Sequence, residues 1–337
     1  MADFNNDGNL DVASADLYAG TFQVLPGDGG GGLGSPKWMA VNDPYTLSSA
    51  AGDLNHDGVA DLVVGASGEL SIFLGRGNGT FRLASISRYS QGLIYSIALA
   101  DFNGDGNLDI VSTNGKKAGT RRSEVVVLIG NGDGTFQFPQ AYGGSGTAKG
   151  GAVTVTTGDV NGDGRPDIAF ITSSGYAAVL LNKGDGTFPK TFNRYFVGYR
   201  ATALQLADVN HDGELDLLTT DGSPDPGLSV MLGLGDGNFE KPVHYPTTQT
   251  GLGDLVVADF NQDGNLDVAA TEPKLKDIAL YIGNSDGSFQ PEILVPSSSA
   301  NLNIGVGDLN GDGAPDLVVT GEKYVGVLLN TGALEPE

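Results

Sequence analysis

Short apolar segments alternate with polar, glycine-containing turns along the whole chain. The apolar residues 255–258 lead into a loop of Asp, Asn and Gly, and an apolar run such as 62–64 follows each such loop. An alternating segment such as 325–329 comes next, then a Gly-rich turn that ends in Phe, as in 130–136, and a weaker segment such as 139–142. Short apolar runs bounded by turn residues indicate β-strands, so this order predicts four strands in each unit.

The polar loop of this unit recurs seven times with one spacing. Its pattern is Asp, an apolar residue, Asn, any residue, Asp, Gly, two further residues and Asp, at residues 3–11, 53–61, 101–109, 159–167, 208–216, 259–267 and 308–316. Repeats of about 48 residues account for the chain, so we expect a single domain over residues 1–337. Four short strands per repeat are typical of a propeller blade, whereas a β-helix has a far shorter repeat. The sequence therefore predicts an all-β fold, a seven-bladed β-propeller with four-stranded blades.

The two ends of the repeat array depart from the pattern. Almost no strand precedes Asp3, and the last unit ends at residues 329–332 without a Gly-Asp-Gly-Thr-Phe turn. We therefore expect the first and last blades to be truncated, and we interpret the chain as trimmed within a repeat.

Each loop places oxygen-bearing side chains at alternate positions around one turn. Asp, Asn and Asp at positions 1, 3 and 5, with Gly at position 6, form the first half of an EF-hand calcium loop. The backbone carbonyl of position 7 and the Asp of position 9 complete the set, while the EF-hand Glu at position 12 is absent. We therefore predict about seven Ca²⁺ ions per chain, held in β-hairpin loops. The predicted ligands are Asp3, Asn5, Asp7, Asn9, Asp11, Asp53, Asn55, Asp57, Val59, Asp61, Asp101, Asn103, Asp105, Asn107, Asp109, Asp159, Asn161, Asp163, Arg165, Asp167, Asp208, Asn210, Asp212, Glu214, Asp216, Asp259, Asn261, Asp263, Asn265, Asp267, Asp308, Asn310, Asp312, Ala314 and Asp316.

A turn without metal is the alternative interpretation, since Asp, Asn and Gly favour turns by themselves. Close carboxylates, however, repel one another unless a cation lies between them. The chain carries 41 acidic and 18 basic residues, for a formal net charge of −23, and the seven loops hold about half of the acids. We attribute the acidity mainly to metal loops. Mg²⁺ fits less well than Ca²⁺, because it demands a compact octahedron and keeps its water molecules.

Composition excludes several other functions. The acidic balance argues against nucleic acid, whose phosphates require clustered Lys and Arg. The absence of Cys excludes disulfides and zinc thiolates, and three His residues leave little material for His-based catalysis or a zinc site. No apolar run approaches the ~18 residues that span a bilayer, so we expect no membrane insertion. The N-terminal residues carry no export signal.

The calcium loops together with turns such as Gly-Asn-Gly-Asp-Gly-Thr-Phe at 130–136 resemble the FG-GAP (VCBS-type) repeat family. Its best-known members are the seven-bladed propeller heads of integrin α subunits, and similar repeats occur in bacterial surface proteins and fungal lectins. The resemblance covers residues 2–332, although the Phe-Gly and Gly-Ala-Pro signature is degenerate here. It implies that each loop joins the first two strands of a blade and binds Ca²⁺ on one face. It leaves the function open, because this fold serves adhesion, sugar binding and scaffolding alike.

A specific site on a repeat protein should lie where the repeats differ. The third unit carries an insertion with Lys116, Lys117, Arg121 and Arg122, which we interpret either as a solvated loop or as a docking loop for an acidic partner or anionic glycan. The stretch 192–200 is the densest in aromatic and cationic residues, and we interpret it either as an ordinary outer strand or as a sugar-binding surface.

A few single residues also stand out. Trp38, near Tyr45, is a further candidate for a ligand surface, although a buried Trp is the more common case in a blade. His56 and His211 occupy the variable fourth position of their loops, so we expect them to face solvent. The Lys-Gly-Asp tripeptide at 183–185 resembles an adhesion motif, but it lies within a repeated turn and is interpreted as structural.

These observations predict a calcium-stabilised, non-enzymatic interaction module that is secreted or on the cell surface and binds a protein, in adhesion, or a glycan. The alternative is a carbohydrate-active enzyme, such as a polysaccharide lyase or dehydratase. Only Arg194, Tyr195, Tyr199 and Arg200 form a non-repeated cluster of suitable residue types for such an enzyme. A structural or engineered repeat scaffold is the third interpretation.

Overall fold

Turns rich in Gly and Asp interrupt the chain every few residues, and the regular elements of the computed structural model are strands. It describes residues 1–337 except 17–19, 42–44, 115–123, 144–150, 190–191, 223–224, 249, 298–301, 322–323 and 333–337, and only the backbone of 16, 90, 91, 114 and 124. Within these ranges there are 26 strands. Helices long and apolar enough to cross a membrane are absent from the same ranges.

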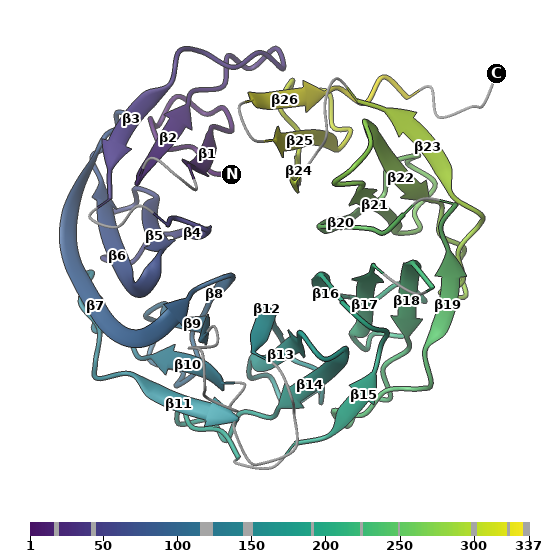
Figure 1. Ribbon diagram of the computed structural model, residues 1–337. Helices are drawn as coiled ribbons and strands as arrows, with labels where there is room; N and C mark the ends of the chain where they lie inside the picture. Colours follow the sequence, from purple (N-terminus) through teal and green to yellow (C-terminus); the bar gives the residue numbers. More distant parts are fainter. Residues whose placement is uncertain are drawn as a thin grey trace. The chain divides into compact units, whose positions relative to one another are not determined.

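The strands form seven antiparallel sheets, each built from consecutive strands of one repeat (Figure 1). The first four sheets are β1 (Val12–Asp16), β2 (Thr21–Leu25) and β3 (Lys37–Ala40); β4 (Ser48–Gly52), β5 (Asp61–Gly65), β6 (Ser67–Gly75) and β7 (Phe81–Leu93); β8 (Ile97–Ala100), β9 (Asp109–Asn114), β10 (Glu124–Leu128) and β11 (Gln140–Gly143); and β12 (Ala152–Gly158), β13 (Asp167–Thr172), β14 (Tyr176–Leu180) and β15 (Arg194–Phe196). The other three are β16 (Ala203–Ala207), β17 (Asp216–Asp221), β18 (Gly227–Met231) and β19 (Val243–Pro246); β20 (Leu255–Ala258), β21 (Asp267–Thr271), β22 (Asp277–Tyr281) and β23 (Ile293–Pro296); and β24 (Asn303–Gly307), β25 (Asp316–Gly321) and β26 (Tyr324–Leu328).

The sheets are divided between two compact units. One unit comprises Met1–Gly27, Leu33–Asp159 and Asp163–Arg194, and the other comprises Asp28–Gly32, Val160–Gly162 and Tyr195–Glu337. Strands β1–β14 therefore lie in the first unit and β16–β26 in the second, with the boundary inside β15.

The predicted fold class, an all-β seven-bladed propeller with four-stranded antiparallel blades, is confirmed. Each repeat forms one blade, and the first and last blades have three strands among the described residues. Within each unit the blades stand next to one another, with first strands such as β4 and β8 on one side and last strands such as β7 and β11 on the other (Figure 1). The single domain over residues 1–337 stays a prediction.

The second and third strands of a blade form the core. β5, β13 and β17 are buried at every residue, because side chains of adjacent blades pack against both faces of each. One apolar cluster, for example, joins Leu54 and Val63 of the second blade to Ile110 and Val126 of the third. Burial on both faces explains why these strands read as continuous apolar runs in the sequence. The fourth strands, such as β19, are half-buried or exposed.

Candidate functional site

All seven polar loops adopt one backbone conformation. Position 6 is Gly with φ between 78° and 92°, and position 4 has φ between 58° and 74°. In the described part of the chain, five residues other than Gly have a positive φ, and four of them occupy position 4: Asn6, His56, His211 and Gln262. A left-handed conformation costs such residues roughly 1 kcal/mol or more, so its recurrence indicates that the loop itself requires it.

The Asp at position 1 organises each loop through its own backbone amides. In the second loop, Asp57 N donates to Oδ1 of Asp53 at 3.2 Å and Gly58 N donates to Oδ2 at 2.9 Å. The same two bonds recur in the other six loops. The carboxylate of position 1 therefore lies over the turn formed by positions 5 and 6.

Positions 3 and 5 are paired in a similar way. Asn55 Nδ2 donates to Oδ2 of Asp57 at 3.0 Å, and Asp57 N donates to Oδ1 of Asn55 at 3.1 Å. Val59 N, at position 7, donates to Oδ1 of Asp57 at 2.9 Å. The structure thus brings the predicted ligands of positions 1, 3 and 5 together on one turn.

The Asp at position 9 differs from these, because it is buried in every loop. In the third loop, Oδ2 of Asp109 accepts a bond from Phe102 N at 2.8 Å, and Oδ1 accepts one from Gly130 N at 2.7 Å. Burial raises the pKa of Asp109 to about 6, against the lowering effect of these two amide bonds. Sequence reasoning assigned position 9 only as a metal ligand, whereas here it also fastens the loop to the end of the third strand.

The equivalent amide bond to Oδ1 is present in all seven blades. Its donors are the amides of Gly27, Gly75, Gly130, Asn182, Gly233, Gly283 and Asn330. A long-range bond of this kind leaves no trace in local sequence spacing. The signal that could have revealed it is the recurrence of Gly or Asn at or within two residues of the end of each third strand.

The Gly-rich turns also contact the loop of the preceding blade. Gly134 N donates to the carbonyl of Leu54 at 3.1 Å, and Gly186 N donates to that of Phe102 at 3.2 Å. Matching bonds join Gly79 to Phe4 and Gly237 to Val160, and Gly31 N of the first blade donates to the Leu309 carbonyl of the seventh. The accepting residue is position 2 of the loop, which is buried in all seven copies and anchors the loop to the core.

The oxygen set of these loops fits a hard cation by its chemistry. Each position-1 or position-5 carboxylate oxygen that accepts one amide hydrogen bond keeps a lone pair for a metal, and carboxylate, amide and carbonyl oxygens are the ligands that Ca²⁺ prefers. Among the residues with described side chains, no three Asp, Glu, His or Cys residues form a ready metal cage. Calcium binding therefore stays a prediction, which the donor chemistry supports.

The stretch 192–200 divides into buried and exposed aromatic residues. Phe192 packs against Phe170, with ring centroids 5.6 Å apart, and Tyr195 Oη donates to Asn238 at 3.2 Å, so both belong to the scaffold. Phe196 and Tyr199 are 44% and 60% exposed, and their ring centroids lie 5.1 Å apart. Sequence reasoning did not separate these two pairs, because alternation alone does not show which neighbours a side chain meets.

The other candidates from the sequence are the basic insertion of the third unit and Trp38. The insertion with Lys116, Lys117, Arg121 and Arg122 lies outside the described residues. The expectation of a buried Trp38 is wrong, because it lies on the outer strand β3 and is 55% exposed.

Both loop histidines are exposed, as predicted. His56 Nε2 lies 2.8 Å from Oδ1 of Asn107 in the next loop. The Lys-Gly-Asp tripeptide at 183–185 lies in a Gly-rich turn, where Thr187 N donates to Oδ1 of Asp185 at 3.0 Å.

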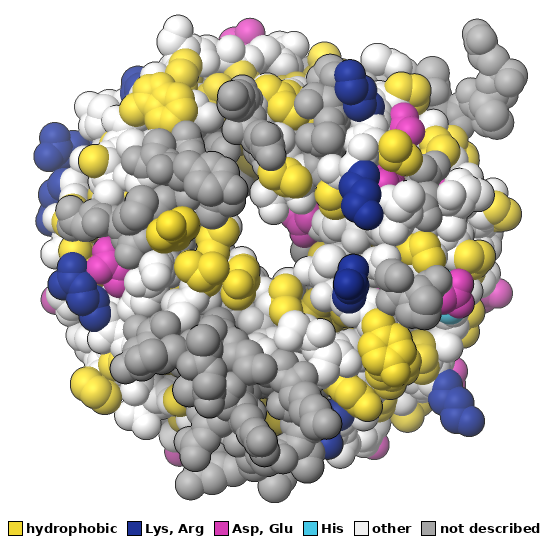
Figure 2. Space-filling model, viewed as in Figure 1, with side chains coloured by type: hydrophobic (Ala, Val, Ile, Leu, Met, Phe, Trp, Pro, Cys, Tyr) yellow, Lys and Arg dark blue, Asp and Glu magenta, His cyan; other side chains and the backbone are white. Residues whose placement is uncertain are grey.

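Basic side chains are spread over the visible surface of the described residues. Figure 2 shows one face, on which several dark-blue Lys and Arg side chains stand singly and others lie close together at the left edge. The absence of nucleic acid as a partner stays a prediction, which rests on the acidic net charge of −23.

Comparison with protein families matches the chain to the FG-GAP-like repeat. It matches residues 3–64, 53–112, 118–170, 159–219, 208–270 and 259–319. Among curated proteins, none is significantly similar in sequence.

Several solved structures share the fold at low sequence identity. An Agrocybe aegerita lectin that recognises non-reducing terminal N-acetylglucosamine has a TM-score of 0.59 and 20% identity, over 96% of this chain and 84% of the lectin. BBS1N, solved in complex with ARL6DN, has a TM-score of 0.65 and 12% identity, over 99% and 92% of the two chains. A protein of unknown function from Desulfotomaculum acetoxidans has a TM-score of 0.67 and 12% identity, over 94% and 90%.

Proposed function

Because the chain belongs to the FG-GAP-like repeat family, we propose that it is a calcium-binding propeller that acts outside the cell as a non-enzymatic interaction module for a protein or a glycan. The observation that carries the calcium assignment is the recurrence of one loop conformation in seven copies. The same left-handed positions and the same side-chain bonds hold three oxygen-bearing side chains on each turn. Turn propensity alone does not require three acidic residues in every copy.

The ligand surface we propose is the exposed pair Phe196 and Tyr199. Two aromatic rings exposed side by side suit the apolar face of a sugar ring or an apolar side chain of a partner protein. Arg200, also exposed, follows them and can donate hydrogen bonds to hydroxyl or carboxylate oxygens. Repeated surfaces would bind several copies of a ligand, whereas this pair lies in a stretch whose sequence differs from the other repeats.

The carbohydrate-active enzyme is less well supported by the same region. Tyr195 donates to Asn238, and Phe239 N donates to Tyr195 Oη at 3.3 Å. Arg194 lies over the ring of Tyr176, 5.6 Å from its centroid. These two residues of the suggested cluster have structural partners, so fewer groups stand free for proton transfer.

A glycan array probed with the calcium-loaded protein, with and without EDTA, tests the proposal. The F196A/Y199A variant should lose binding by about tenfold or more, because truncation of aromatic anchors has the largest effect at an interface. The variant F138A removes another exposed aromatic residue and should bind as the unchanged protein does. Equal binding by F196A/Y199A and F138A would place the ligand elsewhere, and release of cleaved or unsaturated sugar products would favour the enzyme.

A further inference from the structure

The strand β7 is the outermost strand of the second blade, and it is much longer than its counterparts. It spans 13 residues, whereas the fourth strands β11, β15, β19 and β23 have three or four residues each. In the described part of this sheet, β7 pairs with β6 and ends the strand order on its other side (Figure 1). Natural proteins usually keep edge strands short, because the outward N–H and C=O groups of an edge can pair with another chain.

The first half of β7 is open to solvent. Arg82, Leu83 and Ala84 are exposed one after another, and Leu83 is 44% exposed. The register with β6 shifts at this point, so that Ala84 has no partner on β6 and forms a β-bulge. Bulges change the direction in which nearby side chains point, and here they accompany a stretch of edge that another chain can reach.

The third blade holds this edge in place from behind. Ser85 Oγ donates to the carbonyl of Gly134 at 3.3 Å, and Tyr89 Oη lies 2.5 Å from Oγ of Ser112. Both contacts join β7 to residues of the next blade within the first compact unit. A strand that is already fixed loses little further conformational entropy when a partner pairs with it.

Basic side chains gather along the same strand. Arg76, Arg82 and Arg88 are exposed, and residues 62–100 contain a single acidic residue, Glu69. Glu69 is buried and accepts a bond from Arg88 Nε at 2.8 Å. The exposed surface of β7 is therefore positively charged in a chain that has 41 acidic and 18 basic residues.

Lys37 of β3 adds a further positive charge beside the start of β7. Its Nζ donates to the carbonyl of Asn78 at 2.6 Å, in the turn that leads into β7. Arg76 lies in the same turn, and among the described residues neither Arg76 nor Arg82 makes an ion pair. Figure 2 shows dark-blue side chains close together at the left edge of the face, where Figure 1 shows β7.

We propose that the outer edge of β7, from Arg82 to Arg88, is a docking surface for an extended acidic segment of a partner protein, which adds to the second blade as a further strand. The backbone of the segment pairs with the edge, and its carboxylates lie near the basic side chains. Main-chain bonds at a sheet edge give affinity, and alternate side chains give selectivity. This surface goes beyond the function proposed above and lies in a different compact unit from Phe196 and Tyr199.

The length of the edge and the sign of its charge favour an acidic polypeptide. At about 3.3 Å per residue, the strand from Arg82 to Arg88 is about 20 Å long, which accommodates three acidic side chains at alternate positions of a partner strand. An anionic glycan offers negative charge but no amides at strand spacing. Charged residues can also keep an edge from pairing with itself, but acidic residues would serve that purpose equally well in this acidic chain.

The probe is a fluorescently labelled peptide with the sequence Thr-Glu-Val-Glu-Val-Glu-Val-Glu-Thr, blocked at both ends. Its Glu residues lie at alternate positions, so an extended conformation places them on one face. Fluorescence anisotropy with the full chain should detect binding that weakens as salt rises. A matched peptide with Gln at each Glu position should bind about tenfold more weakly or worse, because it lacks the charge.

A second control peptide tests whether the backbone pairs with the strand. Two consecutive N-methylated residues at the centre of the acidic peptide remove a donor from each of its two edges and should also weaken binding by about tenfold. Equal binding of the acidic peptide and either control, or no binding of the acidic peptide, would overturn the proposal.

Two protein variants locate the surface. R76E/R82E reverses two exposed charges and should weaken binding of the acidic peptide by about tenfold or more, with an unchanged melting temperature. K241E/K276E makes the same change in net charge at exposed lysines of the second compact unit and should bind as the unchanged protein does. Equal losses in the two variants would show a general effect of net charge and contradict docking at β7.

Two other occupants of the edge give distinguishable results. If a second copy of this chain occupies it, the apparent affinity for the peptide will fall as the protein concentration rises. If an anionic glycan is the ligand, a sulfated oligosaccharide will bind and R76E/R82E will abolish its binding, while the acidic peptide will not bind. Either result would overturn the proposed acidic segment.

Discussion

Gly130 and Asp109 are joined by a 2.7 Å hydrogen bond from the backbone amide to a carboxylate that is fully buried. The bond links the last residue of the third polar loop to the end of the third strand of the same blade, and Phe102 N supplies the second donor to this carboxylate. Because all seven blades repeat the amide bond to Oδ1, the loops are fastened to their blades by protein contacts alone. The predicted Ca²⁺ would therefore serve the carboxylates of positions 1 and 5, and the attachment of the loop does not depend on it.

Because Asp109, at position 9, fastens its loop to the blade, we predict that D109N destabilises the protein even in EDTA. An amide in place of the carboxylate presents an NH₂ group to one of two buried N–H donors, and an unsatisfied buried donor costs about 1–3 kcal/mol. Denaturant unfolding with EDTA measures the loss. D105N, at the exposed fifth position of the same loop, is the matched control and should change the metal-free stability little. A D109N effect that is seen only with calcium would contradict the structural role.

Because each polar loop is formed by residues close together in the sequence, we predict that D105A removes one calcium site and leaves the other six. Repeats interact chiefly with their neighbours, so a change inside one loop should not spread along the chain. Metal analysis after equilibration with millimolar calcium gives the number of ions per chain. Loss of all the sites from this single change would refute independent loops.

The seven loops predict about seven Ca²⁺ per chain and a melting temperature that falls on chelation. Ligand that binds only the native state stabilises it, by about 2.7 kcal/mol for each site at a free concentration of 100 Kd. Elemental analysis and thermal melts with and without EDTA test both statements. Two or fewer ions per chain, or an unchanged melt, would be incompatible with structural calcium.

Because the carboxyl of Asp221 is buried, we predict that the free energy of unfolding declines as pH rises. Burial raises the pKa of Asp221 to about 7, with the charge of Asp225 adding to the shift and the bond donated by Ser229 opposing it. A carboxyl whose native pKa lies above the unfolded value of about 3.9 holds its proton more tightly in the native state, so stability is lost between about pH 4 and pH 7. D221N should therefore be more stable than the unchanged protein above pH 7, by about 1–3 kcal/mol. Urea unfolding at pH 5 and pH 8 checks this, and equal effects at both values would rule out ionisation of Asp221.

The repeat pattern was sufficient to predict the blades, because burial on both faces makes strands such as β5 and β13 continuous apolar runs. The sequence also predicted which residues share a polar loop, because positions 1, 3 and 5 are close in sequence and lie on one turn. The hydrogen bond by which Asp109 fastens its loop to the blade could not be predicted, because the donor is the backbone amide of Gly130, 21 residues away.

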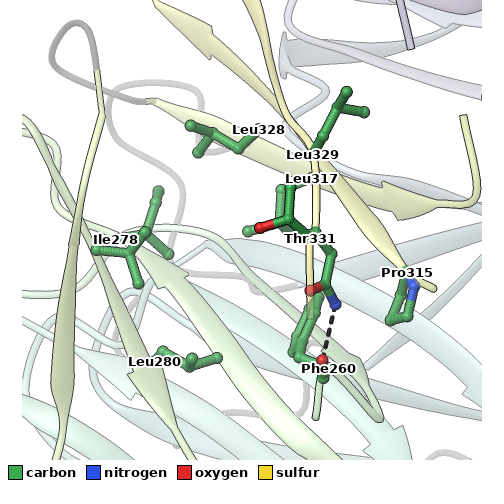
Figure 3. A pocket seen from close by; sticks show the side chains of 10 residues that line it. Phe260, Ile278, Leu280, Pro315, Leu317, Leu328, Leu329 and Thr331 are labelled. Carbon is green, nitrogen blue, oxygen red and sulfur yellow. Dashed lines mark hydrogen bonds between the residues drawn. The ribbon is translucent and has the colours of Figure 1, made fainter. Parts of the chain in front are cut away.

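The exposure of Trp38 and the cavity beside the last blade could not be predicted from the local sequence pattern. The sequence does not distinguish an outer strand that packs on a neighbour from one that faces solvent, so the exposure of Trp38 was wrongly predicted. The cavity lined by Phe260 and Leu317 (Figure 3) depends on side chains from two blades, which lie far apart in the sequence. Only the packed structure brings these side chains together.

The bond from a Gly-rich turn to the loop of a neighbouring blade has a mechanical consequence. Within a unit, blades are attached to one another by short contacts such as Gly134 N to the Leu54 carbonyl, which recur between several neighbouring blades of the described residues. A pulling force applied along the chain therefore acts on one such attachment after another and is not shared by all of them at once. Extension should proceed in steps of one blade, each releasing about 50 residues and thus about 170 Å of extended chain.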